Sequence, residues 1–377
     1  MKFLHLSDLH IGKRVYEFSM LEDQRFILRQ ILEIAEREKP DGVILAGDIY
    51  DKAVPPAEAV QVMDGFLTAL SKMGITVFMI SGNHDSPERI AFGSEIMSGR
   101  GVHVSPVYDG KGRSVTMEDQ YGPVTIWLLP FIKPAVVRHA FPDEEIQTYQ
   151  DAVRTAVEHM NVDPKARNVL AAHQFVTGAS RCESEEIFVG GIDNVDAALF
   201  DVFDYVALGH IHSPQSVGRE EVRYCGTPLK YSFSEAGQVK SVTAVELGEK
   251  GNVGLRQIPL MPLRDMRKIK GTYMEVSARS FYEGPNTEDY VQITLTDEDD
   301  IPDGMQKLRA IYPNLMRLEY DNRRTRENRE ITTFEEVQQK SELELFEEFY
   351  EQQNNQPMSR EQRDFAERLI VEIKGQE

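Results

Sequence analysis

The sequence predicts an α/β domain in which strands and helices alternate in layers, followed by smaller C-terminal elements. Five short runs are apolar at nearly every position, as in strands that are covered on both faces. Segments with helical periodicity separate the first of these runs. Each run delivers Asp, Asn or His near its carboxyl end, which is where ligands bind in open α/β sheets. We therefore expect the five strand ends to meet at one site.

The expected strands are rich in Val, Ile and Leu and are too short to be typical helices. They are FLHLSDLH (3–10), GVILAGDIYD (42–51), TVFMISGNHD (76–85), NVLAAHQF (168–175) and YVALGHIH (205–212). Two amphipathic helices are expected between the first three strands. Residues 20–38 carry apolar side chains along one stripe and stop before Pro40, and residues 56–73 do the same before Gly74.

Composition limits the class of protein. A chain of 377 residues that is 41% hydrophobic can bury a sizeable core and should divide into two or three domains. Cys182 and Cys225 are the only cysteines and have no metal-like spacing, so they give no disulfide framework, and no apolar run is long enough to span a bilayer. We therefore expect a cytoplasmic protein without membrane contact. A net charge of −20 argues that any contact with nucleic acid is local or shared with a partner.

Seven polar residues at the strand ends form a set of carboxylate, amide and imidazole ligands without a thiolate. They are Asp8, His10, Asp48, Asn83, His173, His210 and His212. Such a set suits manganese, iron or zinc. Seven ligands exceed the need of one ion, so we expect two divalent cations. One is bound by Asp8, His10 and His212, and the other by Asn83, His173 and His210. The Asp48 carboxylate is expected to bridge them. Two neighbouring cations activate a water molecule for in-line attack on phosphorus, so the expected chemistry is phosphoester hydrolysis.

Neighbouring residues support this hypothesis. Three glycines directly precede expected ligands, where a missing Cβ permits close backbone approach: Gly47, Gly82 and Gly209. His84 follows Asn83 and is expected to be catalytic, because it could contact the phosphate or protonate the departing oxygen. The alternative for His84 is to orient a ligand. Asp51 and Asp85 could each orient a ligand or merely shape a turn.

The motifs Asp-x-His, Gly-Asp-x-x-Asp, Gly-Asn-His-Asp, a lone His and Gly-His-x-His, in this order, resemble the calcineurin-like metallophosphoesterase superfamily. More narrowly, LHLSDLHIGK, AGDIYDKAVPP, SGNHDSPER and YCGTPLKYSFSE resemble the nuclease subunits of SbcCD-type complexes, and the resemblance covers essentially the whole chain. It implies a four-layer sandwich of two mixed sheets flanked by helices, and two manganese ions (Mn²⁺) held by the seven residues. It also implies exonuclease action on double-stranded DNA ends and endonuclease cleavage of single strands or hairpins, in DNA repair, recombination and replication at the nucleoid.

Three parts of the chain are expected. Residues 1–263 form the nuclease domain, and 264–330 form a small α+β domain, because strand patterns there flank a short helix. The resemblance implies that this module caps the site and helps to present DNA. Residues 331–377 form a linker and a helical hairpin.

The hairpin is predicted from two amphipathic patterns with capping boxes, at Ser341–Glu344 and Ser359–Gln362. It could pack on its own chain or dock on a partner. The resemblance favours docking on the coiled-coil base of an SbcC-type ATPase, with a homodimer of this chain inside a heterotetramer.

Two other functions remain open at this point. The chain could be a metallophosphoesterase acting on small phosphodiesters or monoesters, with the same ligands. It could also be a scaffold that keeps the fold without catalysis, although the full ligand set argues against that.

Overall fold

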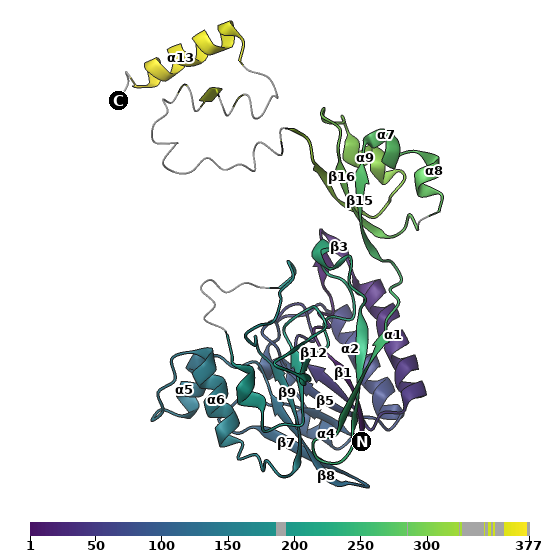
Figure 1. The fold of residues 1–377 in the computed structure, drawn as a ribbon, viewed down its shortest axis with the longest axis vertical. Helices are drawn as coiled ribbons and strands as arrows, with labels where there is room; N and C mark the ends of the chain where they lie inside the picture. Colours follow the sequence, from purple (N-terminus) through teal and green to yellow (C-terminus); the bar gives the residue numbers. More distant parts are fainter. Residues whose placement is uncertain are drawn as a thin grey trace. The chain divides into compact units, whose positions relative to one another are not determined.

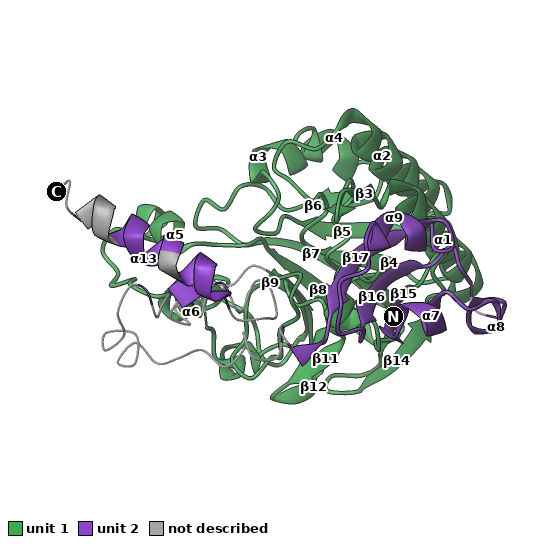
Figure 2. Cartoon of the chain, turned by 90° about the horizontal axis from the view of Figure 1, so that it is seen from above, with its two compact units in different colours: residues 1–266 green, residues 267–377 purple. Residues whose placement is uncertain are grey.

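The computed structural model describes residues 1–185, 194–284, 286–323, 325, 343, 346–347, 350 and 358–374, the last range without the side chains of residues 364 and 371–374. The chain divides into two compact units, Met1–Met266 and Arg267–Glu377 (Figure 2). The boundary expected from the sequence, between residues 263 and 264, lies close to this division.

The first unit contains two six-stranded mixed sheets. In order, the first sheet contains β14 (Val253–Pro259), β13 (Ser241–Leu247), β1 (Lys2–Leu6), β4 (Gly42–Ala46), β5 (Thr76–Ile80) and β6 (Val102–Val104). Strands β1, β4, β5 and β6 are parallel, whereas β13 is antiparallel to both β1 and β14.

The second sheet has a parallel centre and antiparallel edges. In order it contains β11 (Gln215–Val217), β12 (Arg219–Tyr224), β10 (Tyr205–Gly209), β9 (Arg167–His173), β8 (Gly122–Leu129) and β7 (Arg113–Asp119). The four central strands are parallel, and β7 and β11 run against their neighbours. All five predicted strand segments lie in these two sheets: β1, β4 and β5 in the first and β9 and β10 in the second.

The sheets pack face to face because alternate residues of each strand point to opposite sides. Ile44 and Phe78 of the first sheet share a buried cluster with Val169 and Ala207 of the second. The intervening residues of β9 and β10 join a separate cluster with α6. The predicted helices are α1 (Leu21–Glu38) and α2 (Ala57–Lys72), and Figure 1 shows them on one side of the sheets, with α5 (Pro134–Ala140) and α6 (Tyr149–His159) on the other. The predicted four-layer sandwich is confirmed.

Several shorter elements complete the unit: β2 (Arg14–Val15), β3 (Phe18–Ser19), α3 (Pro87–Ile90), α4 (Ser94–Ser98), η1 (Ala197–Phe200) and η2 (Phe233–Glu235). One local prediction is wrong. The aromatic residues Tyr231 and Phe233 of PLKYSFSE favour a strand whose core they would fill, but this stretch forms a loop and the 3₁₀ helix η2. Both aromatic side chains are nevertheless buried.

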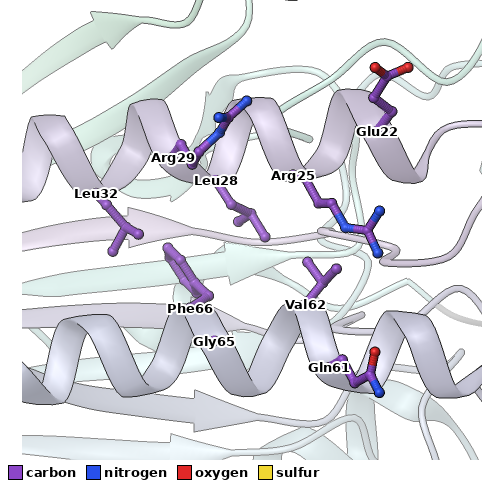
Figure 3. A pocket seen from close by; sticks show the side chains of 9 residues that line it. All are labelled: Glu22, Arg25, Leu28, Arg29, Leu32, Gln61, Val62, Gly65 and Phe66. Carbon is purple, nitrogen blue, oxygen red and sulfur yellow. The ribbon is translucent and has the colours of Figure 1, made fainter.

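Helices α1 and α2 lie side by side, with a groove of about 550 Å³ between them (Figure 3). Leu28, Leu32 and Phe66 line it, and Arg25 and Arg29 add positive charge. None of the seven expected metal ligands lines this groove.

The second unit begins with an α+β module. Its three-stranded sheet has the order β15 (Met266–Gly271), β16 (Tyr290–Leu295) and β17 (Leu315–Tyr320), and its helices are α7 (Tyr273–Val276), α8 (Arg279–Tyr282) and α9 (Gly304–Arg309). Ile269, Val291, Ile293 and Leu308 form its buried core.

The C-terminal tail contains the predicted helical pair. Helix α13 (Arg360–Lys374) begins at the predicted capping box, because the backbone N–H of Gln362 donates to Ser359 Oγ (3.3 Å) and that of Ser359 donates to Gln362 Oε1 (2.9 Å). Of the first predicted helix, residues 343, 346, 347 and 350 are described and helical, and the rest, with its capping box, lies outside the described residues. Gln362 Nε2 donates to Tyr350 Oη (2.8 Å) and Arg363 pairs with Glu347 (2.8 Å), so the two segments lie side by side.

Within the described ranges, no helix combines the length and the apolar character that crossing a bilayer would require.

Candidate metal centre

The seven expected ligands lie at the carboxyl ends of five strands from both sheets. Asp8 and His10 follow β1, Asp48 follows β4, Asn83 follows β5, His173 ends β9, and His210 and His212 follow β10. Backbone bonds extend the β1–β4 pairing past the strand ends, because the N–H groups of Asp8 and His10 donate to the carbonyls of Gly47 (3.0 Å) and Asp48 (2.9 Å). The loops that follow β1 and β4 are therefore joined by backbone hydrogen bonds that continue those of the two strands.

The ligand atoms converge in two groups. On one side, His10 Nε2 lies 3.2 Å from His212 Nε2, and both rings form a potential metal cluster with Asp8. On the other side, Asn83 Oδ1 lies 3.1 Å from His173 Nε2 and 2.9 Å from His210 Nδ1.

Asp48 lies between these groups. Its Oδ2 is 3.7 Å from His10 Nε2 and 3.4 Å from His173 Nε2. One carboxylate oxygen thus faces a ring from each group, as a residue shared by two cations would. Asp8 and Asp48 also form a potential cluster with His173.

The backbone at these positions is unusual. Asp8, His10, Asp48 and His210 all have positive φ angles, of 52°, 44°, 47° and 101°. Residues other than glycine seldom adopt such angles, and each costs on the order of 1–3 kcal/mol. The surrounding structure therefore holds four of the seven expected ligands in strained backbone conformations.

Burial sets the protonation of the imidazoles. It lowers the pKa of His210 to about 3 and holds the pKa values of His10 and His212 well below 6.5, so these rings are neutral and offer lone pairs. Burial would also lower the pKa of His173, but the Asp48 carboxylate beside it raises that pKa to about 9. Burial raises the pKa of Asp8 to about 7. The three neutral rings of His10, His210 and His212 and the side-chain oxygens of Asp8, Asp48 and Asn83 form a donor set that fits divalent cations with mixed nitrogen and oxygen ligands. His173 joins this set on losing the proton that Asp48 stabilises.

Two family models and one relative match this chain. The family model described as calcineurin-like phosphoesterase matches residues 1–214, and the model described as type 5 capsule protein repressor C-terminal domain matches residues 262–354. The SbcD subunit of the nuclease SbcCD from Staphylococcus epidermidis is 31% identical over 381 residues, which cover 100% of both chains. The chain is a calcineurin-like phosphoesterase of the SbcD family. It is therefore a metal-dependent phosphodiesterase.

Two solved structures are similar to this chain at low identity. A dimetal phosphatase from Danio rerio is 10% identical, with a TM-score of 0.40, and covers 70% of this phosphoesterase and 98% of its own chain. The protein TT1561 of Thermus thermophilus is 13% identical, with a TM-score of 0.39, and covers 68% and 98%. At these TM-scores the two likenesses carry no further weight.

Hydrogen bonds fix two of the expected ligand histidines of this phosphoesterase, His173 and His212, in place. His173 Nδ1 lies 2.8 Å from the Ala46 carbonyl, to which it donates, so Nε2 is the nitrogen directed at the centre. His212 Nδ1 lies 2.7 Å from Ser184 Oγ, which itself donates to Glu235 Oε1 (2.6 Å). The fully buried Glu235 is paired with Lys240 (2.6 Å).

The sequence analysis did not identify Ser184 and Glu235 as residues that hold His212. Ser184 stands in a segment without a recognisable motif, and no signal marked it. Glu235 ends the stretch YCGTPLKYSFSE, which in the sequence carries only the family resemblance.

Asp51 and Asp85, whose roles the sequence leaves open, have different surroundings in the structure. Asp85 accepts the backbone N–H groups of Ile49 (3.0 Å), Tyr50 (3.0 Å) and Gly82 (2.9 Å), so it ties the loop of Asp48 to the loop of Asn83. Asp51 pairs with Lys13 (2.8 Å) and lies 3.8 Å from His10 Nδ1. Both positions favour orienting roles over simple turns.

His84 lies at the edge of the centre and is partly exposed. Its Nε2 is 4.0 Å from Asp48 Oδ2, and its ring meets the His10 ring edge-on at a centroid distance of 4.8 Å. Its Nδ1 lies 3.1 Å from the Asp51 carbonyl oxygen, an acceptor that holds the ring in place. His84 thus borders the seven expected ligands, and it forms a further potential metal cluster with His10 and Asp48.

Gly209 gives a direct test of the packing around the centre. A Cβ there would overlap the Ala46 carbonyl oxygen and lie 2.6 Å from His173 Nδ1. We expect Gly209→Ala to destabilise the fold by about 1–3 kcal/mol and to reduce metal binding, because the His173 ring must shift. Thermal denaturation and metal titration measure the two effects. The matched control is Gly65→Ala, since a Cβ at this helical glycine meets nothing within 4 Å. Equal behaviour of the two variants would contradict this prediction.

Proposed function

We propose that the chain is the nuclease subunit of an SbcCD-like complex and hydrolyses DNA phosphodiester bonds with manganese. Its proposed activities are exonuclease action on double strands and endonuclease action on single strands or hairpins, in DNA repair and recombination. The convergence of seven donors at five strand ends carries this proposal, together with the end-to-end alignment with a nuclease subunit.

Each ligand has a proposed role. Asp8, His10 and His212 would hold one cation, Asn83, His173 and His210 would hold the second, and both cations would share Asp48. When bound, the pair of cations would ready a water and stabilise the charge that develops on the phosphoryl oxygens. The donor set contains no thiolate and mixes oxygen with nitrogen, which favours manganese over softer metals.

The other residues around the centre are proposed to donate a proton to the departing oxygen and to hold the expected ligands in position. His84 is proposed to protonate the departing oxygen, because its ring lies beside the donors at the accessible edge of the centre. Asp85 and the Ser184–Glu235 pair hold the loops and His212 in the geometry that the reaction needs.

The experiment uses the full chain with end-labelled duplex DNA, hairpin DNA and bis-p-nitrophenyl phosphate. Manganese and magnesium are varied, with and without the SbcC-type partner. Manganese-dependent cutting of duplex ends and hairpins supports the proposal. Turnover of bis-p-nitrophenyl phosphate without any cutting of DNA in the presence of the partner would identify a small-molecule phosphodiesterase instead.

The three parts of the chain receive separate roles. Residues 1–263 are proposed to cleave DNA, residues 264–330 to cap the site and present DNA, and residues 331–377 to bind an SbcC-type ATPase. The tail proposal is supported by α13, on which Phe365 and Leu369 are 60% and 46% exposed, one helical turn apart. Large apolar side chains in such positions favour docking on a partner helix.

The tail proposal predicts the effect of introducing negative charge at Phe365 and Leu369. We expect Phe365→Asp with Leu369→Asp to weaken binding of the SbcC-type partner about tenfold or more, because buried aromatic anchors carry much of the energy of an interface. Surface plasmon resonance measures the affinity, and Glu367→Ala is the control on another face of the helix. Unchanged partner affinity in the double variant would remove α13 from the proposed interface.

We also propose that the chain forms a homodimer within a heterotetramer and works in the cytoplasm at the nucleoid. Phe92, between α3 and α4, is 85% exposed and Ile96 is 83% exposed, and these two neighbouring apolar side chains are the proposed contact between copies of the chain. Light scattering of the purified chain should therefore give twice the monomer mass of 42.9 kDa.

A further inference from the structure

Arg181 lies beside the half of the metal centre that contains His210. Its guanidinium carbon Cζ is 3.7 Å from the centroid of the Phe175 ring, and that ring meets the His210 ring at a centroid distance of 6.4 Å. Arg181 and Phe175 are both partly exposed. Phe175 is therefore a platform that holds a positive charge close to a proposed metal ligand.

The backbone near Arg181 is tied to the chain that follows β10. The N–H of Ser180 donates to Gln215 Oε1 (2.8 Å), and Gln215 Nε2 donates back to the Ser180 carbonyl (2.8 Å). Further along the chain, the carboxylate of Glu185 accepts the backbone N–H of His212 (2.7 Å). These bonds fix the segment of Arg181 relative to the ligand histidines before any substrate binds.

The charge of Arg181 acts on the centre through apolar surroundings. Burial is the main cause that lowers the pKa of His210 to about 3, and the charge of Arg181 contributes to this shift. The Phe131 ring also lies nearly parallel to the His210 ring, at a centroid distance of 6.4 Å, so two apolar rings flank this ligand. The same charge acts on the carboxylate of Glu185, which is buried and accepts two backbone N–H groups. An ionic contact beside such rings is screened less than one in open water.

Arg181 and His84 border different halves of the centre. The His84 ring meets the His10 ring at a centroid distance of 4.8 Å, whereas Arg181 reaches the His210 side over Phe175. A phosphodiester bound between these borders has the proposed proton donor on one side and a fixed positive charge on the other. A DNA strand continues past the scissile bond and carries a further phosphate there, which a small phosphodiester lacks.

We propose that Arg181 binds the phosphate next to the scissile one in a DNA strand, on the side of the second cation. Its guanidinium donates charge-assisted hydrogen bonds to the non-bridging oxygens of that phosphate, and Phe175 holds the guanidinium plane. Such contacts position a strand without reading its sequence. This inference rests on the proposed nuclease function and deepens it, because it names a residue that favours a polynucleotide over a small phosphodiester.

The test compares two end-labelled single-stranded oligothymidylates. One contains only phosphates, and the other carries a single methylphosphonate, whose methyl group removes the negative charge of one linkage. Cutting of the two bonds beside that linkage is measured on gels, with manganese and the SbcC-type partner present. Wild type should cut one of these bonds about tenfold more slowly than the same bond in the all-phosphate strand, since charge-assisted hydrogen bonds are lost.

Arg181→Gln should cut the all-phosphate strand about tenfold more slowly than wild type and show no further loss beside the methylphosphonate. Because each protein is compared with itself, a change in stability cannot imitate this result. Equal cutting of the two strands by wild type at these bonds, or the same loss in both proteins, overturns the role of Arg181. If wild type cuts neither strand anywhere, the proposed nuclease function itself fails, and this inference fails with it.

Bis-p-nitrophenyl phosphate and the manganese content separate phosphate binding from mere support of His210. The small diester has no second phosphate, so Arg181→Gln should turn it over within about twofold of wild type and bind as much manganese. Arg37→Gln is the matched control, because Arg37 lies in the last turn of α1 and its side chain is 63% exposed. It should behave as wild type on every substrate. An equal loss of rate on bis-p-nitrophenyl phosphate and on DNA in Arg181→Gln would assign Arg181 to holding His210 and overturn the proposal.

Discussion

Asp48→Asn is expected to lose cation binding and to cut DNA slower by a factor on the order of 10³ or more. The substitution removes one negative charge from the oxygen that faces both His10 (3.7 Å) and His173 (3.4 Å). It keeps the rest of the local structure, because asparagine tolerates the positive φ of this position. Its side-chain oxygen can still accept the hydrogen bond from the backbone N–H of His84. Mass spectrometry of bound manganese and a nuclease assay measure the two losses.

The control for Asp48→Asn is Asp143→Asn, the same chemical change at an exposed residue outside the centre. It should leave both the metal content and the cutting rate unchanged. If Asp48→Asn binds as much manganese as wild type and cuts as fast, Asp48 does not bridge two cations.

His84→Gln is expected to lower the rate of DNA cleavage by about 10²–10⁴-fold, the usual contribution of a positioned proton donor. Manganese content should stay the same, because His84 is not one of the seven donors. Glutamine retains a hydrogen-bonding side chain but cannot deliver a proton at neutral pH. The matched control is His139→Gln, which changes an exposed histidine of α5.

A change of leaving group separates proton donation from mere positioning of a ligand. The p-nitrophenolate group departs readily without a proton, so His84→Gln should slow bis-p-nitrophenyl phosphate far less than DNA. A similar loss of rate on both substrates would show that His84 positions a ligand instead. If His84→Gln cuts DNA at the wild-type rate, His84 is not a catalytic residue.

The strands and their polar ends could be predicted because their signals are local. Runs such as GVILAGD are apolar at every strand position and change to a turn at the residue before the ligand, so both the strand and the role of Gly47 are visible. The structure brings together all seven residues that the sequence pointed to. It places their strands in two different sheets, and the resemblance, rather than the residue pattern, indicated two sheets.

The supporting residues could not be predicted, because they depend on contacts between distant segments. Ser184 reaches His212 only through the path of its loop, and Glu235 reaches Ser184 across 51 residues of sequence. The aromatic residues of PLKYSFSE were predicted to be buried correctly, but the strand was wrong, because burial alone does not distinguish a strand from a packed loop.

Diffraction at the manganese absorption edge, from crystals of the chain saturated with manganese, tests the central claim most directly. The account predicts two anomalous peaks, one among Asp8, His10 and His212 and one among Asn83, His173 and His210, with Asp48 in contact with both. A single peak at saturation, or peaks away from these residues, would contradict it.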